Sequence, residues 1–581
     1  MMALRGRPEN KLGRQSKPAW LLGCFLLVAA VAGVSPSSSS QRPTATSPKN
    51  EPASLLLANG VIYTGDAARA RVEAVAIRGE RIVGIGSSQE MRKLAGPKTR
   101  IVDLRGRFAM PGFNDAHIHL ANGGQAKLAI ELEGARSLAE FQQRIRSRLG
   151  EYEPKEWITG RGWDHTLWPV QRFPTRQALD AVSRDHPMIF TRVDGHVAVA
   201  NSLALHLAGI AKDTKDPPGG SIERDAAGEP TGMLKENAVG LVSRKVPPLS
   251  ASQRRRSILL ALAEAARFGV TSLQDNSAWA DFQIYEQLKR EGKLTARITE
   301  WLPFLEPLPR LEEMRRQGGT EDAWLNTGAV KMVVDGSLGS RTAAMLAPYS
   351  DDPANRGILR IEPEQLKQMS VERDRAGFQL AFHAIGDRAN RVALDAFAAV
   401  RAANGPRDRR DRIEHAQVVA PEDFARFAEL GVIASMQPVH ESTDMRWAEA
   451  RLGPARLAGA YAWRTMLSRG VRLAFGTDYP VEPINPLRGL YACVTRELPG
   501  GGPRGGWQPQ EKISLDECVS AYTVGSAYAE FEEGKKGQIL PGQFADIIVL
   551  SADVTRIPAR EFFKTEVLQT FAGGRLVYEK K

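Results

Sequence analysis

Two of the chain's nine histidines occupy alternate positions in one short segment, MPGFNDAHIHL (residues 110–120). Alternate side chains of a β-strand point to the same face, so His117 and His119 share a face if this segment is a strand. Imidazoles fill a packed interior poorly, and a buried pair therefore needs a metal ion or carboxylates as partners. The pair alone is a weak signal, because many such pairs lie in turns or at the surface.

Four more ionisable residues follow apolar, strand-like segments: Lys331 in AVKMVVDG, His383 in AFHAIGD, His415 in RIEHAQ and Asp478 in AFGTD. Each has a structural alternative. His383 fits a hydrogen-bonded core histidine, His415 an ion pair with its neighbour Glu414, and Asp478 a helix cap. Lys331 is harder to dismiss, because lysine is almost never fully buried without a partner. Their joint occurrence after successive strand-like segments predicts one shared site.

The elements that must position these residues form a regular series. From residue 251 onward, helical stretches alternate with the strand-like segments VTSLQDN, ARITEWLPF, GAVKMVVDG, FQLAFHAIGD, DRIEHAQVV, VIASMQPVH and VRLAFGTDYP. With FNDAHIH as the first, there are eight strands. This series predicts an α/β fold with a (β/α)8 TIM barrel and a buried parallel sheet. Barrel enzymes carry their chemistry at the carboxyl ends of the strands, where the polar residues fall.

The two chain ends share a different texture. Short alternating segments punctuated by glycine fill residues 54–110 and return in residues 537–581. Neither piece makes a convincing domain alone, so we predict one small β-sandwich built from both chain ends. The barrel, residues 111–536, is then inserted into this sandwich. It contains a large insertion, residues 121–250, that belongs to no regular unit and follows the strand of the histidine pair, where it could roof the site.

The N-terminal segment has the layout of a secretory signal. A basic stretch leads into AWLLGCFLLVAAVAGV (residues 19–34) and then into a Ser/Pro/Thr-rich stretch. This apolar run is short for a membrane-spanning helix of about 20 residues. We predict a signal peptide or N-terminal anchor over residues 1–35 and a flexible tether over residues 36–53. The protein is then exported, periplasmic or secreted, after signal cleavage; the alternative is a membrane anchor formed by residues 19–34.

The net charge and the cysteine content bear on two further points, nucleic acid binding and disulfide bonds. The formal net charge is +11, but part of the excess lies in the N-terminal segment, and the basic bursts elsewhere lack interleaved aromatic residues. They indicate solvated surface, and we expect no nucleic acid partner. Besides Cys24 in the signal segment, only Cys493 and Cys518 occur, in apolar, helix-like surroundings. Two cysteines are too few for a disulfide framework, so we expect buried free thiols.

Several motifs together resemble a known family. They are PGFNDAHIHL, GWD (162–164), VDGHVAVAN, GEPTGMLKENA, VKMVVDGSLGSRTAAM, AFHAIGD, RIEHAQ, GTDYPVEPINP and LPGQFADIIVL. The chain resembles the amidohydrolase superfamily of metal-dependent hydrolases, and within it the branch of the N-substituted formamide deformylases. The resemblance runs from about residue 54 to the C-terminus, and the combination of motifs is highly specific.

The resemblance implies a metal centre with two Zn²⁺ ions per chain, or one. His117 and His119 would bind the more buried ion, with Asp478 adjacent, and His383 and His415 the second. Lys331 would be carboxylated by CO₂, and the resulting carbamate would bridge the ions. The chemistry agrees, because a desolvated lysine has a lowered pKa and its neutral amine is the form that reacts with CO₂.

The implied reaction is hydrolysis of a non-peptide C–N bond (amide, N-acyl or N-formyl) by metal-activated water, with Asp478 as the general base. The expected partner is a small-molecule amide-like substrate. Candidates for the substrate pocket are Trp163, Asp164, His196 and Arg341, although Trp163 also fits packing and Arg341 an ion pair with a carboxylate such as Asp335. Weaker candidates are Gln437 and His440, at the end of the seventh strand.

Two other functions stay open at this point. One is deamination of a cyclic amidine at a single metal, but deaminases of this superfamily usually lack the bridging lysine carbamate, so Lys331 argues against it. The other is a catalytically inactive binding protein, which has no reason to retain the aspartate together with every ligand. The sequence also allows a homodimer. Membrane contact is expected only through the N-terminal segment.

Overall fold

The computed structural model describes residues 51–192, 197–218 and 220–581. Eight parallel strands form one sheet, in the order of the chain. They are β8 (Phe113–Ile118), β15 (Val270–Asp275), β16 (Arg297–Pro303), β17 (Leu325–Val333), β18 (Leu380–Ala384), β19 (Arg412–His415), β20 (Ile433–Met436) and β21 (Leu473–Phe475). After β21, the backbone N–H of Asp478 donates to the carbonyl of His117 at 2.8 Å, which brings the last strand back to the first. The predicted barrel is confirmed, with a strand in each of the eight expected segments.

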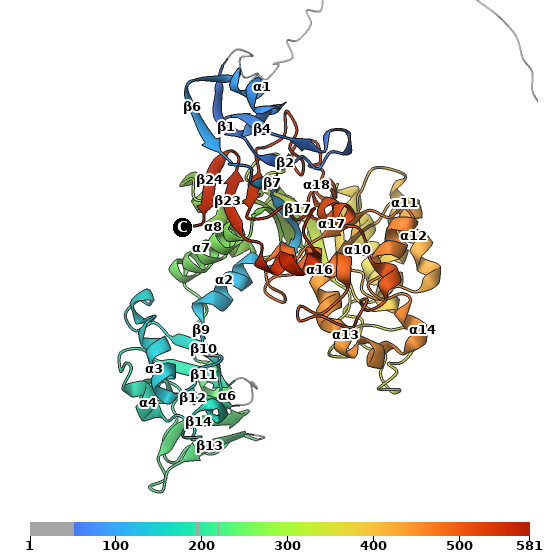
Figure 1. The fold of residues 1–581 in the computed structure, drawn as a ribbon. Helices are drawn as coiled ribbons and strands as arrows, with labels where there is room; N and C mark the ends of the chain where they lie inside the picture. The colour runs from blue at the N-terminus through green and yellow to red at the C-terminus, as the bar shows by residue number, and fades with distance from the viewer. Residues whose placement is uncertain (1–50, 193–196, 219) are drawn as a thin grey trace, which may run out of the picture. The chain divides into compact units, whose positions relative to one another are not determined.

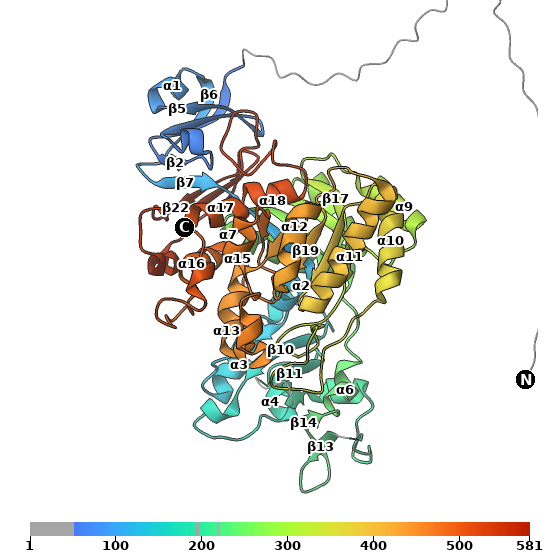
Figure 2. The ribbon, with the colours of Figure 1, turned by 90° about the vertical axis from the view of Figure 1, so that its right-hand side faces the viewer.

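Helices cover the barrel sheet from outside. Figures 1 and 2 show three of them side by side over the strands, α10 (Pro363–Arg375), α11 (Asp387–Asn404) and α12 (Phe424–Leu430). Further helices of the barrel are α7 (Ala251–Arg267), α8 (Trp279–Arg290), α9 (Leu308–Gly318), α13 (Pro438–Leu452), α16 (Pro486–Thr495) and α17 (Leu515–Ala521). Nearly every position of these strands is buried, as expected for a sheet covered on both faces. Several of the buried positions are polar, such as Gln274 of β15 and Arg412 of β19.

Helix α7 illustrates how local sequence sets the boundaries. Ser250 caps its first turn: the side chain accepts from the backbone N–H of Gln253, whose own side chain accepts from the N–H of Ser250. At the other end, Gly269 adopts φ +74°, a left-handed conformation that costs glycine little. Strand β15 begins directly after it, so these two signals fix the register of one helix–strand unit.

Strands from both chain ends share one sheet. Its order is β24-β23-β22-β7-β2-β3, and Figure 1 shows β23 and β24 (red) close to β7 and β2 (blue). Ile548 of β22 pairs with Met110 of β7. The strands are β2 (Val61–Tyr63), β3 (Arg71–Val72), β7 (Phe108–Pro111), β22 (Ile547–Leu550), β23 (Val567–Ala572) and β24 (Arg575–Glu579). A second sheet contains β1 (Ala53–Ala58), β4 (Ala74–Arg78), β5 (Arg81–Gly86) and β6 (Ala95–Asp103). The two sheets share an apolar core that includes Leu57 of β1 and Ile547 of β22. This core confirms the β-sandwich built from both chain ends.

The insertion after β8 forms a sheet of its own, where we expected only an irregular segment. Its order is β13-β14-β12-β11-β10-β9. The strands are β9 (Ile130–Glu131), β10 (Ile158–Trp163), β11 (Met188–Arg192), β12 (Val197–Ala200), β13 (Gly220–Arg224) and β14 (Pro230–Glu236). Parallel and antiparallel pairs are mixed, and two apolar clusters pack on the sheet. Strands this short and this irregular in direction leave no clear periodic signal in the sequence.

The two C-terminal cysteines form a disulfide. Cys493 of α16 and Cys518 of α17 are both buried, with their Cα atoms 6.3 Å apart. The prediction of free thiols is therefore wrong. Burial was expected from the apolar surroundings, but the pairing depends on how α16 packs against α17, which a separation of 25 residues along the chain does not reveal.

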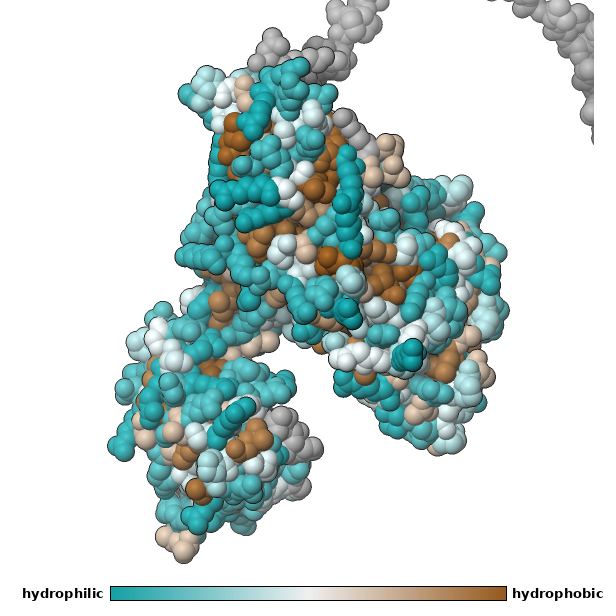
Figure 3. Space-filling view, in the orientation of Figure 1, coloured by the Kyte–Doolittle hydropathy of each residue, from teal (hydrophilic) through white to brown (hydrophobic). Residues whose placement is uncertain are grey.

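Within the described part of the chain, no helix is long and apolar enough to cross a membrane. The apolar run 19–34, the signal or anchor expected over residues 1–35 and nearly all of the tether lie outside the described residues. On the face drawn in Figure 3, hydrophilic residues predominate and apolar residues form separate small areas, in keeping with the ordinary composition.

Candidate metal centre

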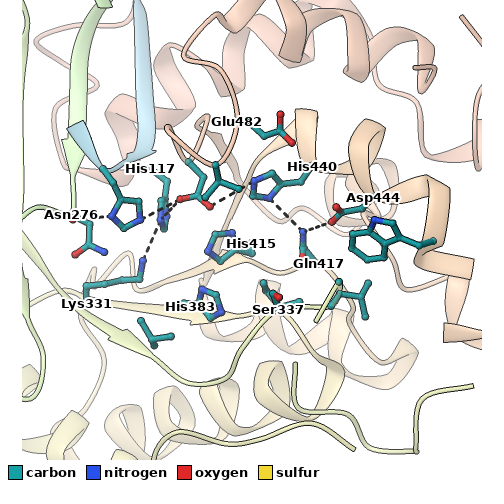
Figure 4. Close-up of a pocket in the computed structure, with 18 residues that line it drawn as sticks. His117, Asn276, Lys331, Ser337, His383, His415, Gln417, His440, Asp444 and Glu482 are labelled. Carbon is teal, nitrogen blue, oxygen red and sulfur yellow. Dashed lines mark hydrogen bonds and ion pairs between the residues drawn. The ribbon is translucent and has the colours of Figure 1, made fainter. Parts of the chain in front are cut away.

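All six residues that the sequence singled out line one cavity of about 410 Å³ at the carboxyl ends of the barrel strands. Figure 4 shows Lys331 and the histidines of several strands turned toward a common centre. The six come from β8, β17, β18, β19 and the segment after β21; they are His117, His119, Lys331, His383, His415 and Asp478. The fold thus brings together side chains that lie up to some 360 positions apart in the sequence.

Three of these residues are close enough to bind one ion. Ligand atoms of His117, His415 and Asp478 all lie within 4.8 Å of one another, and the three residues are buried. His119 joins them, since its Nε2 lies 3.3 Å from Oδ1 of Asp478. Imidazole nitrogens with a carboxylate oxygen form a donor set that suits Zn²⁺.

The other ring nitrogen of each buried histidine is already hydrogen-bonded. Nδ1 of His117 lies 2.6 Å from Oε2 of Glu414, and Nδ1 of His415 lies 2.8 Å from Oε1 of Gln437. A carboxylate or amide oxygen can only accept, so each Nδ1 carries the proton. The lone pair then lies on Nε2, the nitrogen that faces the cavity. This second contact is typical of histidines that bind metals.

In each of the remaining two histidines, His119 and His383, one ring nitrogen is hydrogen-bonded to a backbone carbonyl oxygen. Nδ1 of His119 lies 3.0 Å from the carbonyl oxygen of Asn276, and Nε2 of His383 lies 3.0 Å from that of Gly336. His383 therefore exposes Nδ1 as its free acceptor, whereas His119 exposes Nε2. The imidazole rings of His383 and His415 are 4.5 Å apart between centroids, as two ligands of a second ion would be.

Burial keeps the imidazoles of His117 and His415 neutral. Desolvation, with a smaller effect from the charge of Lys331, lowers the pKa of His117 to about 4. Desolvation, followed by the repulsion of His383, lowers the pKa of His415 well below its usual value. The neutral ring is the form that donates a lone pair to a metal, so neither residue has to lose a proton near pH 7 in order to bind one.

The pKa values of Lys331 and Asp478 are both lowered, which favours the reactive form of each side chain. Burial lowers the pKa of Lys331 to about 8, although Glu414 and Asp478 oppose the shift. Burial alone would raise the pKa of Asp478, but the surrounding imidazoles, first that of His119, lower this pKa well below its usual value. A lysine that is partly neutral near pH 8 and an ionised aspartate meet the chemical requirements of a carbamate and a general base.

The backbone conformation at His415 and at Asp478 sets the direction of each side chain. Successive strand residues point to opposite faces, yet Glu414 and His415 both serve the site. His415 achieves this at the end of β19 by adopting φ +74°, and Asp478 similarly adopts φ +56°. Left-handed conformations of residues other than glycine cost of the order of 1–3 kcal/mol and tend to occur at functional sites.

Trp163 and Asp164, two residues that the sequence suggested for the substrate pocket, lie in the insertion and not in the cavity lining. Trp163 is fully buried in the apolar core of the insertion, and its indole N–H donates to the carbonyl of Phe190. Asp164 accepts from Arg192 at 2.7 Å. Neither lines the cavity, no other described residue of the insertion does, and His196 falls outside the described residues. A roof formed by the insertion therefore stays a prediction.

Arg341 also lies off the cavity lining. Its guanidinium forms two hydrogen bonds to the carboxylate of Asp351, at 2.9 and 3.0 Å, and not to Asp335, the partner the sequence suggested. Asp335 instead accepts from the backbone N–H groups of Ile385 and Gly386 and holds the loop after β18. Arg341 therefore forms an ion pair with Asp351 outside the cavity lining.

One wall of the cavity was missed by sequence reasoning. It carries Asp444 and Trp447 of α13 together with Glu482, and His440 of the same helix lies with Nε2 3.7 Å from Oδ2 of Asp478 (Figure 4). His440 was a weak candidate, and the other three had no signal, because they follow the strands at helical or loop positions. Only the spacing of Asp444 and Trp447 from His440, about one and two helical turns, could have indicated that they share its face.

The comparisons with known proteins agree with this architecture. The model of the family described as "Amidohydrolase family" matches residues 100–578. The protein LONG AFTER FAR-RED 3 of Arabidopsis thaliana is 36% identical over 548 residues, which cover 92% of this chain and 93% of that protein. N-substituted formamide deformylase of Arthrobacter pascens is 28% identical over 542 residues, which cover 90% of this chain and 98% of that enzyme.

A solved structure shows the same likeness in three dimensions. It is described as an uncharacterized metal-dependent hydrolase from Pyrococcus furiosus, with a TM-score of 0.69 and 31% sequence identity. The match covers 86% of this chain and 99% of that chain, so it takes in more than the barrel alone.

Proposed function

Since this chain belongs to the amidohydrolase family, we propose that it is a zinc-dependent hydrolase that cleaves a non-peptide C–N bond in a small amide, N-acyl or N-formyl amine. The observation that carries the proposal is the gathering of four histidines, a lysine and an aspartate around one cavity. A role in core packing does not explain six ionisable side chains that line one cavity.

The residues present fit one or two zinc ions. His117, His119 and Asp478 would hold one, and His383 and His415 a second. Lys331, whose Nζ lies 3.3 Å from Nε2 of His117, would bind between them once CO₂ has added to its amine. This addition forms a nitrogen–carbon bond and releases one proton, and the product is a carbamate with two oxygen donors.

When bound, zinc supplies a Lewis acid that lowers the pKa of a coordinated water towards about 7 and polarises the substrate carbonyl. Asp478 takes the proton of the attacking water at a carboxylate oxygen. As the carbon–oxygen bond forms and the carbon–nitrogen bond breaks, Asp478 returns that proton to the leaving nitrogen. The imidazoles around Asp478 lower its pKa, so the carboxylate is ionised before it takes the proton.

The cavity is the size of a small-molecule site, since such sites span roughly 300–1,000 Å³. Apolar side chains of Val333, Leu338, Ile385 and Val481 line it beside the polar groups. They would bury the acyl or amine substituent of the substrate. The likeness to a formamide deformylase supports a simple amide over a peptide.

A screen of small N-acyl and N-formyl amines, scored by release of primary amine, tests the proposal. Release that disappears after metal chelation and returns with zinc is the expected result. Release of ammonia from cyclic amidines, with one zinc per chain and no amide cleavage, would instead favour a deaminase. Failure to cleave any amide in the zinc-loaded protein would contradict the proposal.

We also propose that the chain is exported. The support is the basic and apolar layout of residues 1–35 together with the disulfide between Cys493 and Cys518, because disulfides persist mainly in oxidising compartments. N-terminal sequencing of the natively expressed protein tests this. A mature terminus near Ser35 is expected, and an intact N-terminus in a soluble cell fraction would contradict export.

A further inference from the structure

His117 and His415 differ in the group that holds their second nitrogen. The partner of His117 is a carboxylate, Glu414, at 2.6 Å, whereas the partner of His415 is a neutral amide, Gln437, at 2.8 Å. A hydrogen bond to an ionised acceptor is roughly twice as strong as one between neutral groups. It also places more electron density on the ring, so His117 is the stronger of the two donors to a metal.

Glu414 is itself held inside the barrel. It is fully buried, and its second carboxylate oxygen accepts from Nε of Arg412 at 2.5 Å. Arg412 is equally buried and also donates to Oγ of Ser435 at 2.7 Å, to the carbonyl of Ala116 at 2.7 Å and to Oε1 of Gln274. These contacts tie β19 to β20, β8 and β15, so neither side chain can rotate without breaking several bonds.

The hydrogen-bonded chain continues to the opposite mouth of the barrel. Nε2 of Gln274 lies 3.4 Å from Oδ1 of Asn114, whose Nδ2 donates to Glu530 at 2.7 Å. Glu530 also pairs with Lys536 at 2.9 Å. Arg412 is therefore anchored on the side away from the metal centre as well as at Glu414.

Stability alone does not account for these charges. A buried ion pair recovers little more than the desolvation it costs, and apolar residues of similar volume often stabilise as well or better. An apolar residue in place of Glu414, however, would leave Nδ1 of His117 without a fixed acceptor. The two tautomers and two ring orientations of His117 would then compete.

We propose that Glu414, held in place by Arg412, is a positioning residue that fixes the tautomer and orientation of His117 and strengthens it as a metal ligand. The inference rests on the proposed metal centre and adds a group that does not itself touch the metal. It predicts that the carboxylate of Glu414 sets metal affinity, although its oxygens are occupied by His117 and Arg412.

The test compares two carboxylate-to-amide variants of the same strand region. Glu414→Gln keeps the shape of the side chain and removes its charge. Asp411→Asn does the same at a buried carboxylate that bonds the backbone N–H of Leu380 and no imidazole. Zinc affinity is measured on the full chain by competition with a chromogenic chelator, and Co²⁺ replaces zinc to record the visible ligand-field spectrum.

Loss of an outer partner of a ligating histidine typically weakens metal binding by roughly 10–100-fold. We expect Glu414→Gln to raise the zinc dissociation constant by that factor and to shift the Co²⁺ spectrum, with Asp411→Asn unchanged in both. A wild-type dissociation constant in folded Glu414→Gln would overturn the inference and leave the proposed function intact. A wild-type protein that binds no zinc would overturn both.

A second variant covers the case in which Glu414→Gln fails to fold. Glu414→Asp keeps the charge opposite Arg412 but withdraws the carboxylate from His117 by about one carbon–carbon bond. We expect Glu414→Asp to bind zinc more weakly than the wild type, whereas Asp411→Asn binds it with wild-type affinity. Equal affinities of Glu414→Asp and the wild type would overturn the inference.

Discussion

Nζ of Lys331 lies 3.3 Å from Nε2 of His117, across the barrel interior from β17 to β8. A lysine ammonium and a neutral imidazole at this distance share one hydrogen bond, and the amine lies beside the histidine proposed to hold one of the ions. Since burial lowers the pKa of Lys331 to about 8, a useful fraction of the amine is neutral at physiological pH. This relationship connects the fold to the proposed chemistry.

Replacing Lys331 should remove the bridge. In Lys331→Gln we expect zinc affinity to fall by more than the roughly 10–100-fold that an outer partner contributes, because a direct ligand is lost. Carbon-13 NMR of protein equilibrated with labelled bicarbonate checks the modification itself. A carbamate signal in the wild type that is missing from Lys331→Gln is expected. The same signal in both proteins would place the carbamate on another amine.

Replacing Asp478 should separate chemistry from metal binding. In Asp478→Asn we expect kcat to fall by about 10²–10⁴, the range for loss of general acid–base catalysis, with most of the zinc retained through the histidines. The control is Asp395→Asn, the same change at a surface carboxylate that pairs with Arg426. Near-normal turnover in Asp478→Asn would rule out the proton-transfer role.

The disulfide between Cys493 and Cys518 should stabilise the helical layer that it joins. For a loop of 25 residues, the loss of chain entropy in the unfolded state is worth about 3 kcal/mol. The double variant Cys493→Ala/Cys518→Ala should therefore unfold at lower urea than the oxidised wild type. A reductant should lower the midpoint of the wild type and leave that of the variant unchanged. Equal midpoints of oxidised and reduced wild type would contradict the bond.

Asp411 predicts a specific pH dependence of stability. Burial raises its pKa to about 7, so from about pH 4 to pH 7 the folded chain holds a proton that the unfolded chain releases. The wild type therefore loses stability through this residue as the pH rises over that window, by about 1 kcal/mol per pH unit, and the loss is complete above pH 7.

Asp411→Asn removes this titration and keeps the oxygen that accepts from Leu380. Its free energy of unfolding relative to the wild type should increase between pH 4 and pH 7 and then level off. Urea unfolding at four pH values measures the difference. A difference that stays constant with pH, or that decreases, would show that the carboxylate titrates normally in the folded chain.

The sequence carried enough information for the barrel and for the six residues of its centre. Apolar runs ending in His117, His383 or Asp478 are strand ends of a buried parallel sheet, and such ends meet at one mouth. Asp444 and Trp447 were missed because they reach the cavity from a helix that follows a strand. The pairing of Cys493 with Cys518 was missed because only helix packing brings the two together.

Anomalous X-ray scattering at the zinc edge, from crystals of the protein as purified, would show whether zinc occupies the cavity. We predict a strong peak between Nε2 of His117, Nε2 of His119 and the carboxylate of Asp478, with added density extending from Nζ of Lys331. A cavity without an anomalous peak, in protein that hydrolyses amides, would contradict the metal centre on which this account rests.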